Sequence, residues 1–291
     1  MPLVAEKLTK DYGSFRALDS LDLVLAPGEV FGLLGPNGSG KTTALRILLG
    51  FLKATSGTAS IAGFDCWTRG VEARKSVAYL PGELRLYENM TGRRLVAFLA
   101  GLRGEEPGPE VDDLAKKLDI DIDRPLTQMS SGMKRKVALL AVLLPKVPLI
   151  VLDEPTNTLD PTMRDELLEQ LKRAKDRGQA VLFSSHVLQE VEAVCDRVGI
   201  LRKGVLVHVQ NLAELRDGRT VSAKLTGPPP ALDPNGEPLG LDRIAADGRL
   251  NLTWRGPLPP LLNWLARHPM DDLRVEPLGL APIYKRFHGS N

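Results

Sequence analysis

A glycine-rich stretch, Gly35–Thr43, constrains the fold of this chain more than any other feature. It reads Gly-Pro-Asn-Gly-Ser-Gly-Lys-Thr-Thr and fits the spacing G-x-x-x-x-G-K-[ST]. The apolar run Val30–Leu34 precedes it and predicts a buried strand, and Ala44–Leu49 follows with helix-compatible residues. A helix N-terminus after such a turn favours anions, because its backbone N–H groups and its dipole both face the loop. The stretch therefore predicts a phosphate-binding loop in an α/β fold.

Each residue type in the loop has a chemical purpose. The glycines let the backbone bend and turn its N–H groups toward phosphate oxygens. Lys41 adds a compact positive charge for the β- and γ-phosphates, and the Thr42 hydroxyl is a ligand for Mg²⁺. The predicted nucleotide contacts in this loop are Gly35, Asn37, Gly38, Ser39, Gly40, Lys41, Thr42 and Thr43.

Charge and composition exclude several classes of protein. There are 38 basic and 36 acidic residues, so a net charge of +2 gives no reason to expect a nucleic-acid partner. The two cysteines, Cys66 and Cys195, have no metal-like spacing and are expected to be buried free thiols. The most apolar window, Val137–Leu152, is interrupted by Pro145 and Pro148 and falls short of the roughly 20 residues of a spanning helix. We expect a chain that does not cross a membrane unaided.

The chain before the loop alternates short apolar runs with turns, which predicts an antiparallel β-rich start. Tyr12 lies in the turn-like sequence Asp-Tyr-Gly. Its ring is either an ordinary core or surface aromatic, or a flat platform for a purine base. The residue pattern alone favours the first of these interpretations.

Residues 84–145 have a different character. Leu95, Val96, Phe98, Leu99 and Leu102 recur at helical spacing, and so do Val111, Leu114, Ala115 and Leu118. This pattern predicts a helical insertion that joins the main sheet only at its ends.

Another helix is expected over Lys134–Leu144, after the sequence Met129-Ser130-Ser131-Gly132-Met133. Ser130 or Ser131 is expected to cap it. Lys134 and Arg135 in its first turn oppose the helix dipole, which suggests that something anionic or acidic approaches this end.

Two carboxylates, Asp153 and Glu154, follow the apolar run Leu149–Leu152. Ligands of open α/β sheets collect at the carboxyl ends of strands. A carboxylate there can hold Mg²⁺, and its neighbour can orient or deprotonate an attacking water. Solvated acids at a strand end are the plain alternative, but the phosphate loop in the same chain favours the functional interpretation.

A further buried strand, Val181–Ser185, ends at His186. This histidine is either structural or a donor to a γ-phosphate oxygen. After about residue 216 the turns Gly227–Pro230, Pro234–Gly236 and Pro257–Pro260 divide short strand-like runs. They predict a small α+β appendage over 216–291 with one short helix, Leu261–Ala266, and with Trp254 and Trp264 in its core.

These pieces, in this order, resemble the ATP-binding cassette family of transport ATPases. The likeness covers residues 1 to about 215. It rests on the phosphate loop, on the Leu149–Glu154 strand, on Thr158-Leu159-Asp160 as the D-loop, on His186 as the switch histidine, and on Ser130-Ser131-Gly132-Met133 in the place of the signature Leu-Ser-Gly-Gly-Gln. It also implies that Tyr12 stacks on adenine.

Two positions depart from the family pattern. The signature is degenerate, since Met129, Ser131 and Met133 replace a leucine, a glycine and the glutamine. Gly82 stands where the family places a glutamine that touches Mg²⁺ and the attacking water, so water, the backbone or the neighbouring Glu83 is expected to substitute for it.

The resemblance implies a P-loop NTPase core with an antiparallel β subdomain and the helical insertion over residues 1–215, followed by the accessory domain over 216–291. It implies ATP and Mg²⁺ as cofactors, with Thr42 and Asp153 on the metal and Glu154 and His186 as the catalytic residues. Ser130, Ser131, Gly132 and Asp160 would contact the nucleotide across an ATP-bound homodimer.

The stand-alone ATPase subunits of ABC-2 type exporters are the most similar group. They imply membrane-spanning permease subunits on a separate chain, with this chain cytoplasmic and peripheral on the inner face of the cell membrane. Two alternatives remain open: a soluble non-transport cassette ATPase acting on nucleic acid or ribosomes, and a nucleotide-binding regulatory module with little turnover.

Overall fold

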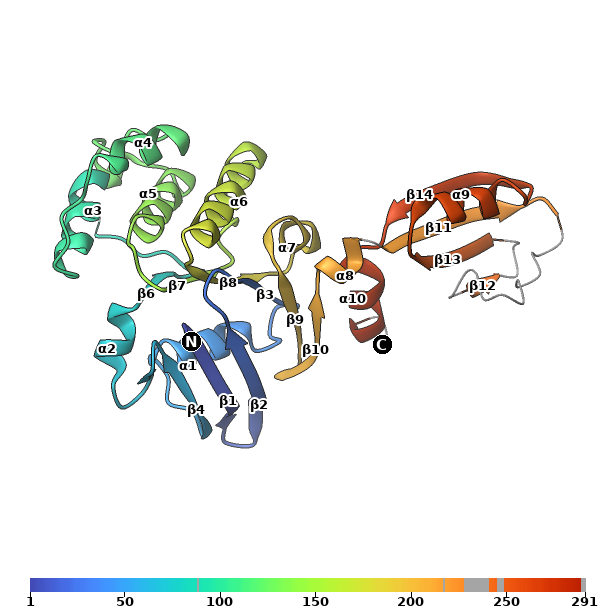
Figure 1. The fold of residues 1–291 in the computed structure, drawn as a ribbon. Coiled ribbons are helices and arrows are strands. Elements are labelled where there is room, and N and C mark those ends of the chain that lie inside the picture. The colour runs from blue at the N-terminus through green and yellow to red at the C-terminus, as the bar shows by residue number, and fades with distance from the viewer. Residues whose placement is uncertain (88, 217, 228–240, 245–248, 289–291) are drawn as a thin grey trace. The chain divides into compact units, whose positions relative to one another are not determined.

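A six-stranded sheet forms the centre of residues 1–210 in the computed structural model (Figure 1). The structure describes residues 1–291 except 88, 217, 228–240, 245–248 and 289–291. The strand order is β10 (Val205–Asn211), β9 (Arg197–Arg202), β3 (Val30–Leu34), β8 (Ala180–Ser185), β7 (Leu149–Asp153) and β6 (Val77–Leu80). The pairs β9–β3, β3–β8, β8–β7 and β7–β6 are parallel. The carboxyl ends of these strands therefore meet at one edge.

The strands β3, β7 and β8 are buried along their whole length, which explains why each is apolar up to the polar residues that end β7 and β8. On one side of the sheet lie α6 (Pro161–Asp176) and α7 (Leu188–Val194), and on the other lies α1 (Lys41–Leu48) with a second sheet (Figure 1). The sequence analysis did not predict α7.

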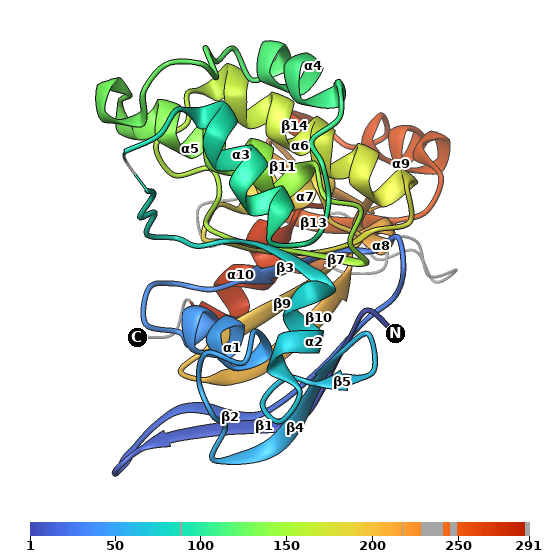
Figure 2. The same ribbon diagram turned by 90° about the vertical axis from the view of Figure 1, so that its left-hand side faces the viewer.

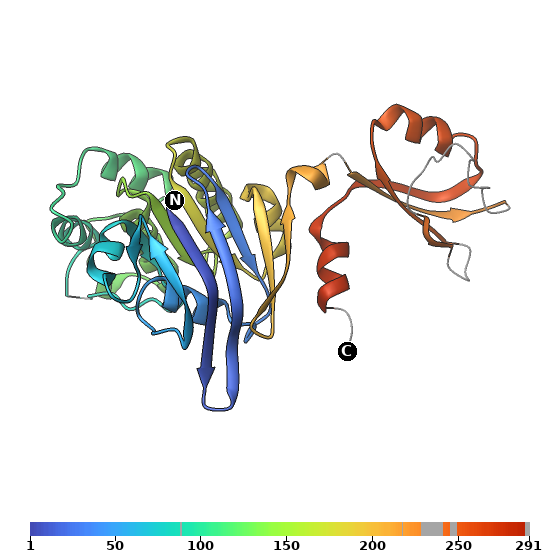
Figure 3. The same ribbon diagram turned by 60° about the horizontal axis from the view of Figure 1, so that its bottom comes forward.

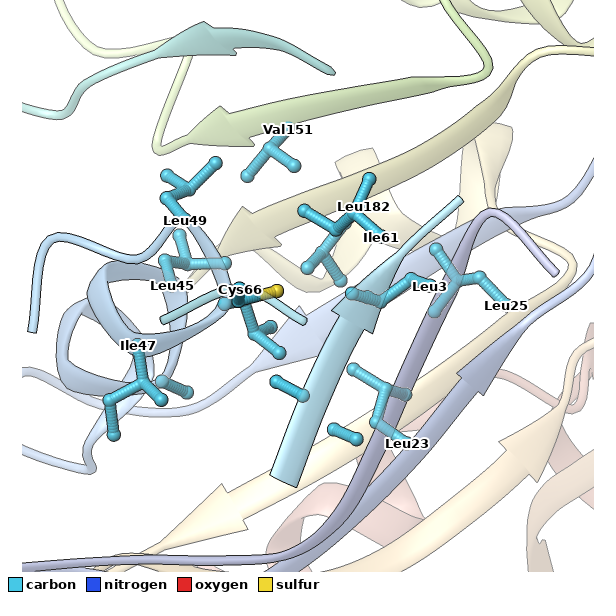
Figure 4. Packing of buried hydrophobic residues seen from close by; sticks show 14 of the residues in the cluster. Leu3, Leu23, Leu25, Leu45, Ile47, Leu49, Ile61, Cys66, Val151 and Leu182 are labelled. Atoms are coloured by element: carbon cyan, nitrogen blue, oxygen red, sulfur yellow. The ribbon is translucent and has the colours of Figure 1, made fainter. Parts of the chain in front are cut away.

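The second sheet is antiparallel and has the order β2-β1-β4-β5. Its strands are β1 (Leu3–Tyr12), β2 (Phe15–Leu25), β4 (Ser56–Ile61) and β5 (Phe64–Asp65). Its inner face, α1 and one face of the central sheet share a single apolar core, in which Leu45, Ile61 and Val151 come from the three layers (Figure 4). Cys66 belongs to this core, and both it and Cys195 are buried free thiols, as predicted.

The helical insertion is also present. It contains α3 (Gly92–Gly101), α4 (Glu110–Lys117), the 3-10 turn Leu126–Gln128 and α5 (Ser131–Leu143), grouped together in Figure 2. Leu95 of α3 and Val137 of α5 share a small core with Leu126 and Met129. Just after α3, the Arg103 guanidinium donates to the carbonyl oxygens of Lys75, the last residue of the short helix α2 (Gly70–Lys75), and of Val77, the first residue of β6.

The remaining residues form a separate compact unit, Asn211–Asn291, whereas the sequence predicted a boundary at about residue 215. It begins with α8 (Ala213–Arg216) and has an antiparallel sheet ordered β12-β13-β11-β14. The strands are β11 (Gly218–Leu225), β12 (Leu241–Ile244), β13 (Arg249–Arg255) and β14 (Met270–Pro277), and the helices are α9 (Leu258–Leu265) and α10 (Leu280–His288). The predicted turns over 228–230 and 234–236 lie outside the described residues.

The core of this unit forms where α9 covers one face of the sheet (Figure 3). Trp254 is buried there with Leu261 and Leu265, and Trp264 is partly buried against them, as the sequence predicted. The helix begins earlier than predicted, at Leu258, because prolines fit the first turn of a helix, where no N–H partner is needed. The sequence analysis missed β14 and α10.

Among the residues that the structure describes, no helix has both the length and the apolar character needed to cross a membrane.

Candidate functional site

The loop between β3 and α1 is built around two glycines that no other residue can replace without strain. A Cβ on Gly35 would lie 2.5 Å from the Leu201 carbonyl oxygen and 2.6 Å from Ser39 Oγ. Gly40 has a φ of +108°, and a Cβ there would lie 2.8 Å from the Ala17 carbonyl oxygen. The loop can therefore pass this close to β9 and β2 only with hydrogen in both places. The loop also holds a buried hydroxyl, Ser39 Oγ, that finds no hydrogen-bond partner among the residues that the structure describes.

The Lys41 side chain is only 5% exposed and folds back over the loop. Its ammonium donates to the carbonyl oxygens of Gly35 at 2.7 Å and Pro36 at 3.3 Å. It also lies 3.5 Å from Glu154 Oε1. A buried cation at the start of α1 suits an anionic ligand of high charge, because water screens it poorly.

Asp153 lies at the carboxyl end of β7 between two hydroxyl groups. Its Oδ1 accepts a 2.6 Å hydrogen bond from Ser184 Oγ, and its Oδ2 accepts a 3.3 Å hydrogen bond from Thr42 Oγ1. The Thr42 hydroxyl and the Asp153 carboxylate are hard oxygen donors side by side, as Mg²⁺ requires. No group of three His, Cys, Asp or Glu side chains in the described part of the chain could hold a metal alone. A Mg²⁺ ion that uses only these two ligands would take its others from phosphates and water, which suits this ion.

The backbone of Glu154 is held in an uncommon conformation, with φ at +46°. Its N–H donates to Ser184, with the hydroxyl oxygen at 3.0 Å and the carbonyl oxygen at 3.2 Å. The carboxylate is 3.5 Å from His186 Nδ1, and its Oε2 accepts a 3.0 Å hydrogen bond from Asn157 Nδ2. The structure thus brings together Lys41, Glu154 and His186, which lie far apart in the sequence.

The charge of Glu154 follows from these contacts. Partial burial by itself raises the pKa of Glu154, but the Asn157 amide, the Lys41 ammonium and His186 outweigh it, and the pKa lies below its ordinary value. The carboxylate is therefore ionised at neutral pH. It can accept a proton or orient a water molecule next to the cation that would bind phosphate.

Gly82 leaves open space beside this carboxylate pair. A Cβ built on it would lie 3.5 Å from Asp153 Oδ2, which is ordinary contact. A longer side chain at this position would reach the Asp153 carboxylate, and glycine supplies none. Glu83 is exposed, and the carbonyl of Gly82 accepts a 2.8 Å hydrogen bond from Arg135 Nη1.

The structure does not join the other predicted nucleotide contacts to this site. Tyr12 is half-exposed at the end of β1, with the Lys10 ammonium 5.1 Å from its ring centroid. Ser130 caps α5 by accepting a hydrogen bond from the Met133 N–H, and Asp160 caps α6. Among the described residues, no hydrogen bond or ion pair joins Ser130, Ser131 or Gly132 to the phosphate loop. The signature turn instead meets the D-loop, since a Cβ on Gly132 would lie 3.2 Å from the Thr158 carbonyl oxygen.

The interpretation of Arg135 as a residue that faces an anionic partner is wrong. Its side chain is 3% exposed, and it donates to backbone carbonyl oxygens at the ends of β6 and β7. The charges at the start of a helix do not reveal this, because the side chain turns inward and reaches other elements.

Sequence reasoning also missed residues that support the site. Asn157 and Ser184 bind Glu154 and Asp153 directly. Glu190, buried on α7, accepts hydrogen bonds from Thr156 Oγ1 at 3.0 Å and from Ser185 Oγ at 2.9 Å, and so joins the loops after β7 and β8. The only signal for these residues was their position next to, or one helical turn after, a motif residue.

A cavity of about 600 Å³ lies between the helical insertion and β6. It is lined mainly by apolar side chains, among them Tyr79, Leu84, Leu99 and Ala138. Tyr87 also lines the cavity, and its exposed ring lies edge to face with the exposed ring of Phe98, with the centroids 5.8 Å apart. No residue of the phosphate loop lines this cavity, so it is a second feature of the chain.

Comparisons with known proteins place this arrangement in context. A family model described as ABC transporter matches residues 18–157. The chain is 36% identical over 216 residues to an uncharacterised ABC transporter ATP-binding protein, YhcH of Bacillus subtilis, covering 73% of this chain and 70% of that protein. It is 31% identical to the linearmycin resistance ATP-binding protein LnrL of the same organism, with the same coverage of both chains. The Nod factor export ATP-binding protein I of Burkholderia thailandensis is 35% identical, over 70% of this chain and 68% of that protein.

Solved structures agree with these relatives. An ATP-binding subunit of an ABC transporter superposes with a TM-score of 0.69 at 28% identity, over 74% of this chain and 92% of that one. A dimeric ATP-binding cassette bound to ADP and Pi has a TM-score of 0.65, over 72% of this chain and 98% of that one. Its 22% identity supports the fold alone.

Proposed function

This chain belongs to the ABC transporter family as an ATP-binding subunit with ATPase activity, and we propose that it drives export through separate membrane-spanning subunits. The observation that carries the proposal is the Glu154 carboxylate, which lies between the Lys41 ammonium and His186 at the carboxyl edge of the central sheet. Nucleotide phosphates bind where the loop amides and Lys41 converge.

In this proposal the phosphate loop holds the β- and γ-phosphates, and Glu154 orients a water molecule and accepts its proton. The water oxygen attacks the γ-phosphorus, the bond to the bridging oxygen breaks, and ADP and phosphate form. His186, on the same carboxylate, donates to the γ-phosphate and senses its loss. Tyr12, exposed and flat, stacks on the adenine ring.

Thr42 and Asp153 are the residues that would hold Mg²⁺, because their oxygens already lie together. When bound, the ion neutralises phosphate charge. Ser184 keeps the Asp153 carboxylate in one orientation through its 2.6 Å hydrogen bond.

ATPase subunits of this family dimerise, and we propose that two copies of this chain enclose two ATP molecules. The support is that Ser130 and Ser131 are exposed at the N-terminus of α5. Among the described residues, neither makes a hydrogen bond or ion pair with the phosphate loop of its own copy. A hydroxyl and free N–H groups at a helix start suit a γ-phosphate held by the other copy. Asp160 and Thr158 lie beside them in the D-loop and would face the same interface.

The apolar cavity beside the helical insertion is where we place the cytoplasmic helix of a permease subunit. Its lining joins α3 and α5 to the stretch 81–87, which follows β6. A partner helix with one apolar face fits such a groove. The chain would then act at the inner face of the cell membrane, and the names of the resistance and Nod factor export relatives favour outward transport.

Two measurements test the proposal. Purified protein should hydrolyse ATP steadily, and co-purification from membranes should recover a multi-spanning protein. No hydrolysis would instead support the low-turnover regulatory role that Gly82 and the degenerate signature suggest. Recovery of ribosomes or nucleic acid without a membrane protein would support the non-transport alternative.

A further inference from the structure

One buried arginine binds the backbone at the carboxyl ends of two strands of the central sheet. Arg135 lies in the first turns of α5, and all five N–H groups of its guanidinium donate to backbone carbonyl oxygens. On the β6 side these are Pro81 at 3.1 Å and Gly82 at 2.8 Å. On the β7 side they are Asp153 at 3.3 Å, Glu154, and Pro155 at 3.2 Å.

The fit is specific for arginine. A guanidinium has five donors in a planar fork, whereas the ammonium of lysine has three donors at one point. Burial lowers the pKa of Arg135, while the Asp153 and Glu154 carboxylates oppose this effect, and the group stays charged. The cost of burying it is offset by the carbonyls, which would otherwise lie buried without partners.

Glu154 is thereby anchored on both sides of its side chain. Its N–H is bound by Ser184, and its carbonyl is bound by Arg135. These two anchors hold the residue at its φ of +46°, a conformation that a glutamate would otherwise leave. The direction in which the carboxylate points therefore depends on Arg135.

The same guanidinium reaches the two parts of the chain that would meet partners. Gly82 has no side chain, so Arg135 binds it through its backbone carbonyl, and it lies directly after Pro81, which lines the apolar cavity. Ser130, which would face the ATP of the second copy, caps the helix that carries Arg135. Any shift of α5 or of residues 81–87 must therefore move the Arg135 guanidinium relative to Glu154.

We propose that Arg135 is a positioning residue that transmits movements of the signature end of α5 and of the 81–87 stretch to Glu154. At position 82 this chain has no glutamine side chain to connect the stretch to the site. The hydrogen bond from Arg135 to the Gly82 carbonyl makes that connection instead. This inference rests on the proposed function, because it requires the groove and the Ser130 end to be the surfaces that partners engage.

The chain offers a matched control in Arg103. Its guanidinium also joins the helical insertion to carbonyls of the β6 segment, with Nη2 donating to Val77 at 2.7 Å and Nη1 to Lys75 at 3.3 Å. These carbonyls lie at the amino end of β6, away from Glu154. Arg103 also lines the apolar cavity, but the assay uses the purified chain without a partner, so Arg103→Lys weakens the same kind of contact away from Glu154.

The test compares Arg135→Lys with Arg103→Lys in the purified full chain. We expect Arg135→Lys to lower kcat by about tenfold or more, because small displacements of a catalytic group have large effects on rate. The Kd of a fluorescent ATP analogue should change less than about threefold, since phosphate binding uses the loop and Lys41. Arg103→Lys should leave both values within about twofold.

Several results would overturn the proposal. These are an unchanged kcat in Arg135→Lys, an equal loss in both variants, or a loss confined to nucleotide affinity. If thermal melting shows that Arg135→Lys does not fold, Arg135→Gln is measured in the same way, and failure of both to fold would make Arg135 a stability residue only. Lack of ATP hydrolysis by the parent chain would instead count against the proposed function.

Discussion

Ser184 Oγ donates a 2.6 Å hydrogen bond to Asp153 Oδ1, joining the carboxyl ends of two adjacent parallel strands inside the candidate site. The same hydroxyl oxygen accepts from the Glu154 N–H. One small side chain on β8 thus binds both the carboxylate of Asp153 and the backbone N–H of Glu154.

Replacing Ser184 with alanine should weaken the binding of Mg²⁺ at the site. The change leaves Asp153 Oδ1 buried with one partner fewer, which costs about 1–3 kcal/mol of stability. We expect the Mg²⁺ concentration for half-maximal ATP hydrolysis to rise by about tenfold or more, as is typical when a partner of a metal ligand is removed. A magnesium titration of turnover measures this effect. The matched change Ser222→Ala, on β11 of the separate C-terminal unit, should leave the titration as it is.

Glu154→Gln should abolish turnover and keep ATP binding. The amide cannot accept a proton from water, so kcat should fall by about 100-fold or more. Phosphate binding uses the loop and Lys41, and two copies should therefore remain closed around ATP as a dimer that light scattering detects. Glu169→Gln, an exposed change on α6, is the control. Turnover at the parent rate in Glu154→Gln would remove Glu154 from the role of base.

The pH dependence of hydrolysis should report the pKa of Glu154. This pKa is depressed, so the carboxylate stays charged as the pH falls through the ordinary range of a glutamate, and activity is lost only below it. Asn157→Ala removes the largest of the contacts that lower it, while the burial that raises it remains. The acidic limb of kcat/KM should therefore move to higher pH in Asn157→Ala. The limb should not move in Asn251→Ala, an exposed change on β13, and an unmoved limb in both would contradict the assignment.

Tyr12 can be tested by comparing two substitutions. Tyr12→Phe keeps the flat ring, and Tyr12→Ala removes it from an exposed position that the fold does not require. Stacking on a base is worth about 1–3 kcal/mol, so the alanine variant should bind ATP about 5- to 150-fold more weakly. The phenylalanine variant should bind within about twofold of the parent. Equal affinities for all three proteins, measured by calorimetry, would mean that adenine lies elsewhere.

The chemical outline of the site is predictable from the order of residues alone. The runs Val30–Leu34, Leu149–Leu152 and Ala180–Phe183 are apolar because both faces of a parallel sheet are covered, and the polar residues that follow them must then meet at one edge. Lys41 and Glu154 were predictable from that rule and from the spacing of the glycines.

The contacts that hold this outline in place arise only when the chain folds. The five carbonyls bound by Arg135 lie between 18 and 54 positions away in the sequence, and local pattern places such a side chain at an exposed helix start. Asn157, Ser184 and Glu190 likewise gain their roles from neighbours on other elements. The physical reason is that backbone carbonyls carry no sequence signature, so the partner of a buried polar group is known only once the chain has folded around it.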